Sequence, residues 1–278
     1  MHIFLIILIL SIILAILIHV VLEIDMVRNH SSINSNYSKK SKNIIERNNN
    51  INVKFIEEEK IIPKKILQTY KSFNSVPSYV VDNIKKLNQD WEYCFYDDND
   101  CIDFLNKEFG KTFVDKFNSF KKGAHKSDLF RICWLYINGG VYIDIDTELI
   151  VGLNDIVKNV DSFTILQNDT PTTIQGTLIY NFFKKHDTLI NSFMVINKGN
   201  KYIKKCIENI MKINQEDLKD YPMVLFVMQN TLKDNIKYQL FERRPQYLTN
   251  KRMEIYDKYD NLVGYSCYEK YKKGEFKV

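Results

Sequence analysis

Apolar and polar positions along most of the chain follow two periods, which predicts strands separated by amphipathic helices. Short apolar runs predict strands at 65–70, 92–96, 163–167 and 192–196. Spacings of three and four residues predict helices at 77–89, 99–106, 201–213 and 222–232. This alternation predicts an α/β fold with a mainly parallel sheet, helices on both faces, and ligands at the carboxyl ends of the strands.

A further predicted helix, 122–138, ends at a pair of glycines. Its apolar side chains recur every three or four positions, which predicts one face packed against a core. Asp128 and Arg131 lie together on a neighbouring face, where such a pair contributes little in isolation. Because only Gly139 and Gly140 separate this helix from the next apolar segment, we expect the helix and that segment to form one compact αβ unit.

The segment after the two glycines places two carboxylates two positions apart. Strand alternation puts Tyr142, Asp144 and Asp146 on one face. An isolated Asp-x-Asp is more often a strand running into a solvated acidic loop, but the adjoining helix reverses that preference. Acids this close raise each other's pKa, which favours a divalent cation such as Mg²⁺ or Mn²⁺ between them. Together with Asp128 and Arg131, they suit a phosphorylated ligand that carries several hydroxyls.

The block from Ser127 to Glu148 resembles the signature of the family 32 glycosyltransferases with a DxD sugar-binding motif, which include the yeast-type α-mannosyltransferases of the Golgi. The run from Ile62 is similar to the opening motif of that family, with Leu67 in place of its usual His and Tyr70 in place of its usual Trp. The spacing of the Asp, Arg, Tyr, Asp and Asp residues also resembles that of the large clostridial glucosylating toxins. The resemblance covers roughly residues 60–230.

The resemblance implies a GT-A fold and a retaining, metal-dependent transferase that moves a sugar from a nucleotide sugar, GDP-mannose or a UDP-sugar, to a glycan, glycolipid or protein. It implies Mn²⁺ or Mg²⁺ bound by Asp146 directly, with Asp144 at the ribose and the metal's second sphere. Asp128 and Arg131 would hold the hydroxyls of the donor sugar. The remaining donor-binding residues would be Tyr142 and Asn191. The C-terminal motif that can complete the metal site in this family has no clear counterpart here, so the sequence identifies no third ligand.

Two other classes of protein stay open. An apolar strand followed by Asp-x-Asp also begins the haloacid-dehalogenase phosphatases, where the first Asp is a nucleophile. That motif has Thr or Val two residues after the second Asp, where this chain has Glu148, and it normally opens its domain. The chain also fits a membrane-tethered pseudoenzyme or binding module that keeps a nucleotide-sugar pocket without turnover.

The N-terminus carries an apolar run over 3–22 that is interrupted only by Ser11 and His19. This run is long enough to cross a hydrocarbon core of about 30 Å. It also exceeds the apolar region of a cleaved signal peptide, about 7–15 residues, and no small-residue cleavage site follows it. We therefore predict a transmembrane signal anchor at 1–23.

Residues 24–60 are polar and rich in Asn, Ser and Lys, which predicts a flexible stem before one GT-A-like domain at 61–278. The net charge of +5 is spread along the chain without a nucleic-acid-binding motif, so no nucleic-acid partner is expected. The abundance of Ile, Lys and Asn is typical of an AT-rich genome, such as that of a large DNA virus or a protist. The cysteines have no spacing typical of a zinc site or a disulfide framework: Cys94, Cys101, Cys133, Cys206 and Cys267.

The orientation of the anchor is predicted differently by charge and by resemblance. Arg28 and the lysines at 39–42 follow the apolar run, and the positive-inside rule would keep them cytosolic. The resemblance implies a type II protein with a lumenal domain, which is the placement we expect. Sequons at Asn29, Asn36 and Asn168 are compatible with a lumen.

Overall fold

The structure is a computed structural model that describes residues 34–48, 51–168, 188–219, 222–237, 239–243 and 253–266, together with residues 12, 14–18 and 21. The strands are β1 (Lys65–Thr69), β2 (Glu92–Tyr96), β3 (Gly140–Ile143), β4 (Thr147–Leu149), β5 (Phe163–Asn168), β6 (Thr188–Ile196), β7 (Leu240–Arg243), β8 (Met253–Asp257) and β9 (Leu262–Ser266). The α-helices are α2 (Ser78–Leu87), α3 (Asp98–Phe109), α4 (Lys111–Ser119), α5 (Gly123–Asn138), α6 (Leu153–Val157), α7 (Lys201–Ile210) and α8 (Met223–Leu232). Short 3₁₀ helices are η1 (Phe73–Ser75) and η3 (Asp217–Lys219).

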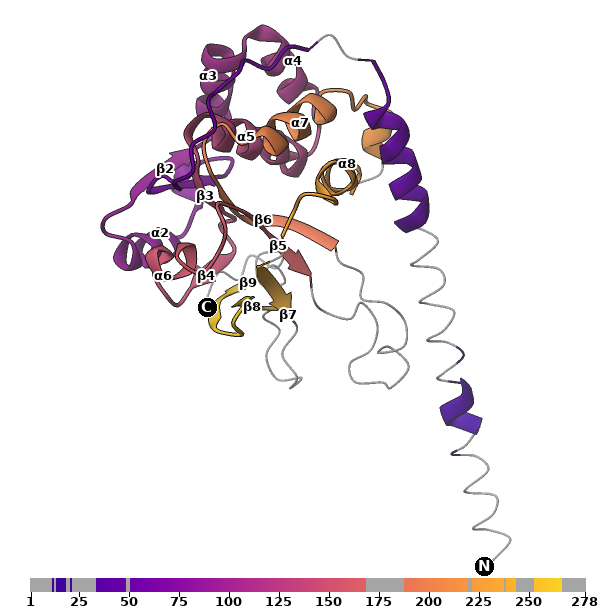
Figure 1. Cartoon of the computed structure of the whole chain (residues 1–278), viewed down its shortest axis with the longest axis vertical. Coiled ribbons are helices and arrows are strands. Elements are labelled where there is room, and N and C mark those ends of the chain that lie inside the picture. Colours follow the sequence, from indigo (N-terminus) through magenta and orange to yellow (C-terminus); the bar gives the residue numbers. More distant parts are fainter. Residues whose placement is uncertain are drawn as a thin grey trace, which may run out of the picture.

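The described strands form one nine-stranded sheet in the order β2-β1-β3-β6-β5-β7-β8-β9-β4. In this order β3 and β4 are six strand spacings apart, which would be about 29 Å in a flat sheet. The three residues 144–146 connect them, and a connection of this length spans at most about 14 Å. The sheet must therefore curl until its last strand returns to β3, and the Asp-x-Asp residues lie where it closes (Figure 1).

The prediction of a mainly parallel sheet is wrong, although the α/β class with helices on both faces is confirmed. Five of the eight described pairings are antiparallel. Helical crossovers join β1 to β2 and β2 to β3, and these strands are parallel. The connections between β7, β8 and β9 are shorter than the dozen or so residues that a crossover between parallel strands needs, and these strands are antiparallel neighbours.

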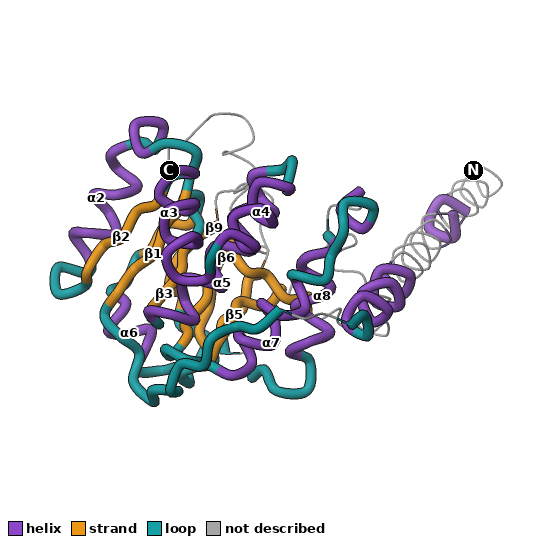
Figure 2. The backbone as a smooth tube through the Cα atoms, turned by 90° about the horizontal axis from the view of Figure 1, so that it is seen from above, coloured by secondary structure: helices purple, strands orange, loops and turns teal. Residues whose placement is uncertain are grey.

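Strict alternation along β3 divides the core into two layers. Tyr142 faces a layer built with α3, α4, α5, α7 and α8. Val141 and Ile143 face a second layer, to which α2 and α6 contribute together with the strands β7, β8 and β9. The two groups of helices lie on opposite sides of the strands (Figures 1 and 2).

The segment that precedes β1, which we call the N-terminal arm (residues 34–48 and 51–60), is packed against the domain although its sequence predicts a flexible stem. Residues 34–45 form a helix, and Ile44 and Val53 are buried in the same core layer as α5. Arg47 forms an ion pair of 2.5 Å with Asp217, the first residue of η3. The hydroxyl of Tyr136 on α5 donates to the carbonyl of Lys54 over 2.8 Å. These contacts place the arm on the helical layer.

Most of the predicted membrane span lies outside the described residues. The described residues, 12, 14–18 and 21, are helical, and their large apolar side chains are exposed. Within the part of the chain that the structure describes, no helix is long and apolar enough to cross a membrane.

Candidate active site

The Asp-x-Asp residues form a turn after β3. The predicted alternation ends at Ile143, and Ile145 packs in a separate small cluster beside η1 and α2. The amide of Asp144 donates to the carbonyl of Ser192 on β6 over 2.8 Å, and the amide of Thr147 donates back to the carbonyl of Asp144 over 3.1 Å. The acidic residues are therefore held between two strands, at the closing point of the curled sheet.

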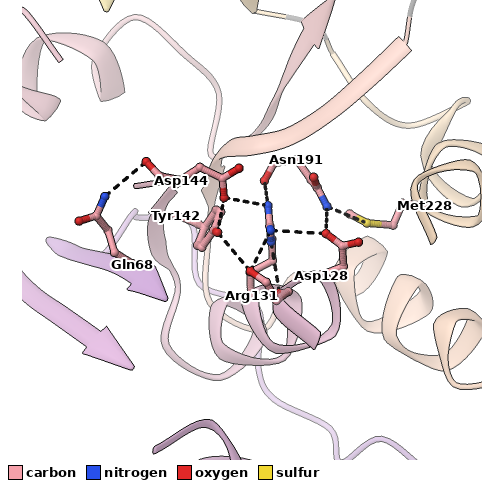
Figure 3. Close-up of polar contacts among 8 residues, drawn as sticks. Gln68, Asp128, Arg131, Tyr142, Asp144, Asn191 and Met228 are labelled. Carbon is pink, nitrogen blue, oxygen red and sulfur yellow. Dashed lines mark hydrogen bonds and ion pairs between the residues drawn. The ribbon is translucent and has the colours of Figure 1, made fainter. Parts of the chain in front are cut away.

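Arg131 of α5 lies against this turn. Its Nη1 is 3.3 Å from Oδ1 of Asp144. The guanidinium also stacks over the ring of Tyr142, with Cζ 4.2 Å from the ring centroid, and the Tyr142 hydroxyl donates to the same Oδ1 of Asp144 (Figure 3). Helix periodicity and the two-glycine turn bring these three side chains together, as predicted.

Asp128 of α5 is bonded to Asn191 at a bulge in β6. On β5, Ile165 pairs with Met194 whereas Leu166 pairs with Ile190. The intervening residues of β6 are therefore unpaired with β5. Bulges of this kind redirect side chains. Here the amide of Asn191 donates to Oδ1 of Asp128 over 2.7 Å (Figure 3).

Further polar contacts hold the backbone of the turn and the neighbouring Tyr142. Gln68, which is fully buried on β1, donates to the carbonyl of Asp144 over 3.4 Å. Its own carbonyl oxygen accepts a hydrogen bond of 2.9 Å from Tyr93 on β2. Ser127 lies on the opposite side, with its hydroxyl 3.3 Å from that of Tyr142. The backbone and one face of the Asp144 side chain are thereby fixed by protein contacts.

Burial changes the acidity of this cluster. It raises the pKa of Asp128, an effect that Arg131 and the bond from Asn191 partly offset. It also raises the pKa of Tyr142 well above its usual value, so this phenol stays protonated and donates to its acceptor. Burial, followed by repulsion from Asp144 and Glu242, raises the pKa of Asp146 to about 7.

Glu242 is a residue that sequence reasoning missed. It lies on β7, is 8% exposed, and repels Asp146 strongly enough to raise its pKa. Burial also raises the pKa of Glu242, while a hydrogen bond with Ser266 on β9 lowers it. No local motif marks Glu242, because only the curl of the sheet brings β7 toward the acidic turn. Three other missed residues, Gln68, Ser127 and Met228, contact predicted site residues directly.

The structure brings together five of the predicted residues in one contact network, Asp128, Arg131, Tyr142, Asp144 and Asn191. Asp146 joins this network through electrostatic interactions with Asp144 and Arg131. Within the described part of the chain, no group of three or more His, Cys, Asp or Glu side chains is arranged to hold a metal ion. The catalytic and ligand-binding roles of these residues stay predictions.

The fold and the acidic turn define an α/β protein with a DXD site. Residues 18–163, more than half of the chain, match the family described as a glycosyltransferase sugar-binding region containing a DXD motif, and the chain belongs to this family. The expectation of a family of DXD glycosyltransferases is therefore confirmed.

Two fungal relatives have names that refer to mannose and to an inositol-phosphate ceramide. The chain is 31% identical over 135 residues to a mannosyl phosphorylinositol ceramide synthase of Saccharomyces cerevisiae, which covers 47% of this chain and 35% of the relative. It is 30% identical over 133 residues to an inositol phosphoceramide mannosyltransferase of Schizosaccharomyces pombe, or 46% of this chain and 35% of that one. These alignments thus span about a third of each relative.

Among solved structures, the PaToxG glycosyltransferase aligns with a TM-score of 0.45 at 15% identity, covering 74% of this chain and 78% of its own.

Proposed function

We propose that this chain is a metal-dependent, retaining glycosyltransferase that uses a nucleotide sugar. The observation that carries the proposal is the contact network around the DXD turn, in which an acid pair, a guanidinium and a polar amide converge from α5, β3 and β6. The carboxylates and the amide of this set suit a ligand with a metal-bound diphosphate at one end and sugar hydroxyls at the other. Retention of the anomeric configuration is proposed from the family resemblance.

We propose that the two acids of the turn bind a divalent cation, Mn²⁺ or Mg²⁺, with Asp146 as the direct ligand and Asp144 in support. Two carboxylates lie two positions apart in one turn, and burial, together with the neighbouring carboxylates, raises the pKa of Asp146 to about 7. Oxygen ligands are those that hard cations prefer. The cation would stabilise the negative charge of the departing diphosphate. Glu242 adds to the negative field that attracts it.

Asp128 and Asn191 are proposed to contact hydroxyls of the donor sugar. Both are nearly buried and already bonded to each other, so their orientation is set before a ligand arrives. The names of the two fungal relatives favour mannose as the transferred sugar and an inositol phosphoceramide as the first lipid acceptor to test. UDP-sugars, and glycan or protein acceptors, stay in the proposal because donor and acceptor were left open by the sequence.

Membrane anchoring is a separate proposal. The apolar run over 3–22 has the length of a membrane-spanning helix. We infer a type II orientation with a lumenal domain, in a membrane of the Golgi or ER type or in a viral membrane.

A donor screen tests the proposed reaction. Purified protein is incubated with Mn²⁺ and each of several UDP- and GDP-sugars, and release of free sugar and transfer to inositol phosphoceramide are measured. We expect turnover of one donor by the wild type and its loss in Asp146→Asn. Asp234→Asn, which changes an exposed acid at the end of α8, is the matched control and should be fully active. Donor binding without any turnover would favour a binding module, and trapping of an aspartyl phosphate would indicate a phosphatase.

A further inference from the structure

We propose that Arg131, held by Ser127, positions Asp144 from inside the protein and does not bind the donor sugar. This inference rests on the proposed function, because it concerns how the same site presents its acids. It changes the role that the sequence suggested for Arg131, which was a direct contact with sugar hydroxyls.

Every nitrogen of the Arg131 guanidinium has a protein partner. Nε donates to the carbonyl of Ser127 over 3.2 Å, and Nη2 donates to the Ser127 hydroxyl over 2.9 Å. Nη1 donates to the carbonyl of Asn191 over 2.5 Å. Arg131 also forms two ion pairs, from Nη2 to Asp128 at 3.4 Å and from Nη1 to Asp144 at 3.3 Å. The donors that would bind a sugar are therefore in use within the protein.

The position of Arg131 is equally unsuited to direct contact with a ligand. The residue is 4% exposed, and the ring of Tyr142 covers the guanidinium at 4.2 Å. A buried guanidinium loses much of its hydration, so removing its partners to free it for a ligand would be costly. Because several bonds hold the guanidinium of Arg131 from different directions, they also fix the positions of the groups that it contacts.

The group that Arg131 fixes most directly is the carboxylate of Asp144. Its Oδ1 accepts the Tyr142 hydroxyl and faces Nη1 of Arg131. The hydrogen bond from Tyr142 and the ion-pair contact with Arg131 both fall on Oδ1, and the Asp144 side chain is 31% exposed. Asp144 is thus held at one oxygen and keeps the other for a ligand. Arg131 also bonds the carbonyl of Asn191, so the same guanidinium holds the β6 bulge in register with the DXD turn.

Ser127 orients the guanidinium of Arg131. It lies one helical turn before Arg131 on α5, and its carbonyl and hydroxyl both accept from the guanidinium. Its hydroxyl also lies 3.3 Å from that of Tyr142. Replacing Ser127 with alanine removes the hydroxyl contacts and leaves all charges unchanged, which separates positioning from charge.

The test compares two ligands that differ only in the sugar. Calorimetry in the presence of Mn²⁺ measures the affinity of GDP and GDP-mannose, and of UDP and UDP-glucose, for the wild type, Arg131→Lys, Ser127→Ala and Asp128→Asn. If Arg131 positions Asp144, which serves the nucleotide and metal end, Arg131→Lys weakens both ligands of a pair equally, by about ten- to a hundredfold. Ser127→Ala should also weaken the affinity for both ligands of a pair equally, but by a smaller factor. Asp128→Asn changes a residue proposed to contact the sugar. It should weaken binding of the sugar nucleotide alone, and it serves as the reference for that outcome.

A loss in Arg131→Lys that is confined to the sugar nucleotide would overturn the proposal, and so would an unchanged affinity for both ligands. Thermal unfolding confirms that each variant is folded, and Ser127→Ala serves if the lysine variant is not. A wild type that binds none of the ligands would remove the proposed function itself. In that case ¹⁵N NMR of the ligand-free protein still tests the positioning role. The Nε–H and Nη2–H protons of Arg131 should be protected from exchange in the wild type, and Ser127→Ala should remove the protection of Nη2–H while Nε–H, which donates to the Ser127 carbonyl, keeps it. An unprotected Nε–H in the wild type would contradict it.

Discussion

The amide of Asn191 donates to Oδ1 of Asp128 over 2.7 Å, and this bond joins the β6 bulge to α5 within the site. Asn191→Asp replaces the donor with a second acceptor and brings two carboxylates together in a buried place. Like charges at that distance raise each other's pKa and repel. We expect donor turnover to fall about ten- to a hundredfold, since a bond to a charged group contributes about 1.5–3 kcal/mol.

The control for this prediction is Asn235→Asp, which makes the same change at an exposed position after α8. Initial rates of donor hydrolysis and melting temperatures are measured for both variants. Equal rates in Asn191→Asp and the wild type would mean that the Asn191–Asp128 pair does not contribute to the reaction.

A second prediction concerns pH and Asp146 in metal-free protein. The pKa of Asp146 is raised from 3.8 to about 7 by burial and by the nearby carboxylates. Between these values the folded state holds more protons than the unfolded state, so the free energy of unfolding decreases as pH rises from about 4 to about 7. Asp146→Asn removes this titration, so the variant should become more stable than the wild type as pH rises toward 8.

Chemical denaturation with a chelator present, at several pH values between 5 and 8, measures this difference. Adding Mn²⁺ to the wild type should reverse the trend, because the metal binds the deprotonated acid. A constant difference between the two proteins across this range would show that Asp146 does not titrate there.

The sequence predicted the part of the site that is local in the chain. Asp128, Arg131, Tyr142 and Asp144 lie within one helix, a two-glycine turn and one strand, and the two periodicities determine how such a unit is arranged. Glu242 was not predictable in this way. Its approach to Asp146 depends on the curl that returns β4 to β3, and that curl follows from pairing between strands far apart in sequence.

The N-terminal arm was misjudged for a different physical reason. Its composition is polar enough for a solvated stem, and only a few apolar residues attach it to the core, among them Ile44 and Val53. Apolar anchors at irregular intervals do not produce a periodic pattern. The arm is also held by specific polar contacts such as the Arg47–Asp217 pair, which no sequence window reveals.

A third prediction follows from the path of the arm over Gly199. This glycine has φ +71°, and a Cβ built there would lie 2.3 Å from the carbonyl oxygen of Glu57. Gly199→Ala should therefore lower the melting temperature and make the arm accessible to protease. Gly123→Ala is the matched control, because a Cβ at that position on α5 meets nothing within 4 Å. Equal melting temperatures for the two variants would mean that the arm can leave its position without cost.

The last prediction concerns membrane orientation. If the domain is lumenal, Asn36 and Asn168 should be glycosylated when the chain is synthesised with microsomes, whereas Asn29 lies close to the predicted span. Asn36 is exposed on the arm helix. Endoglycosidase treatment should then increase electrophoretic mobility, and Asn36→Gln should reduce the shift. Unglycosylated protein that added protease digests would place the domain on the cytosolic side, as the basic residues after the span suggest.

The pairing of β4 with β9 has a consequence for how the protein is made. Thr147, directly after the DXD turn, pairs with Ser266, so the downstream side of the turn is bonded to the last described strand. During synthesis the α5–β3 unit can form as soon as it leaves the ribosome, but β4 must wait for more than a hundred further residues before its partner strand exists. A premature stop just before β9 would leave every predicted catalytic side chain in the product and still remove the strand on which the acidic turn closes.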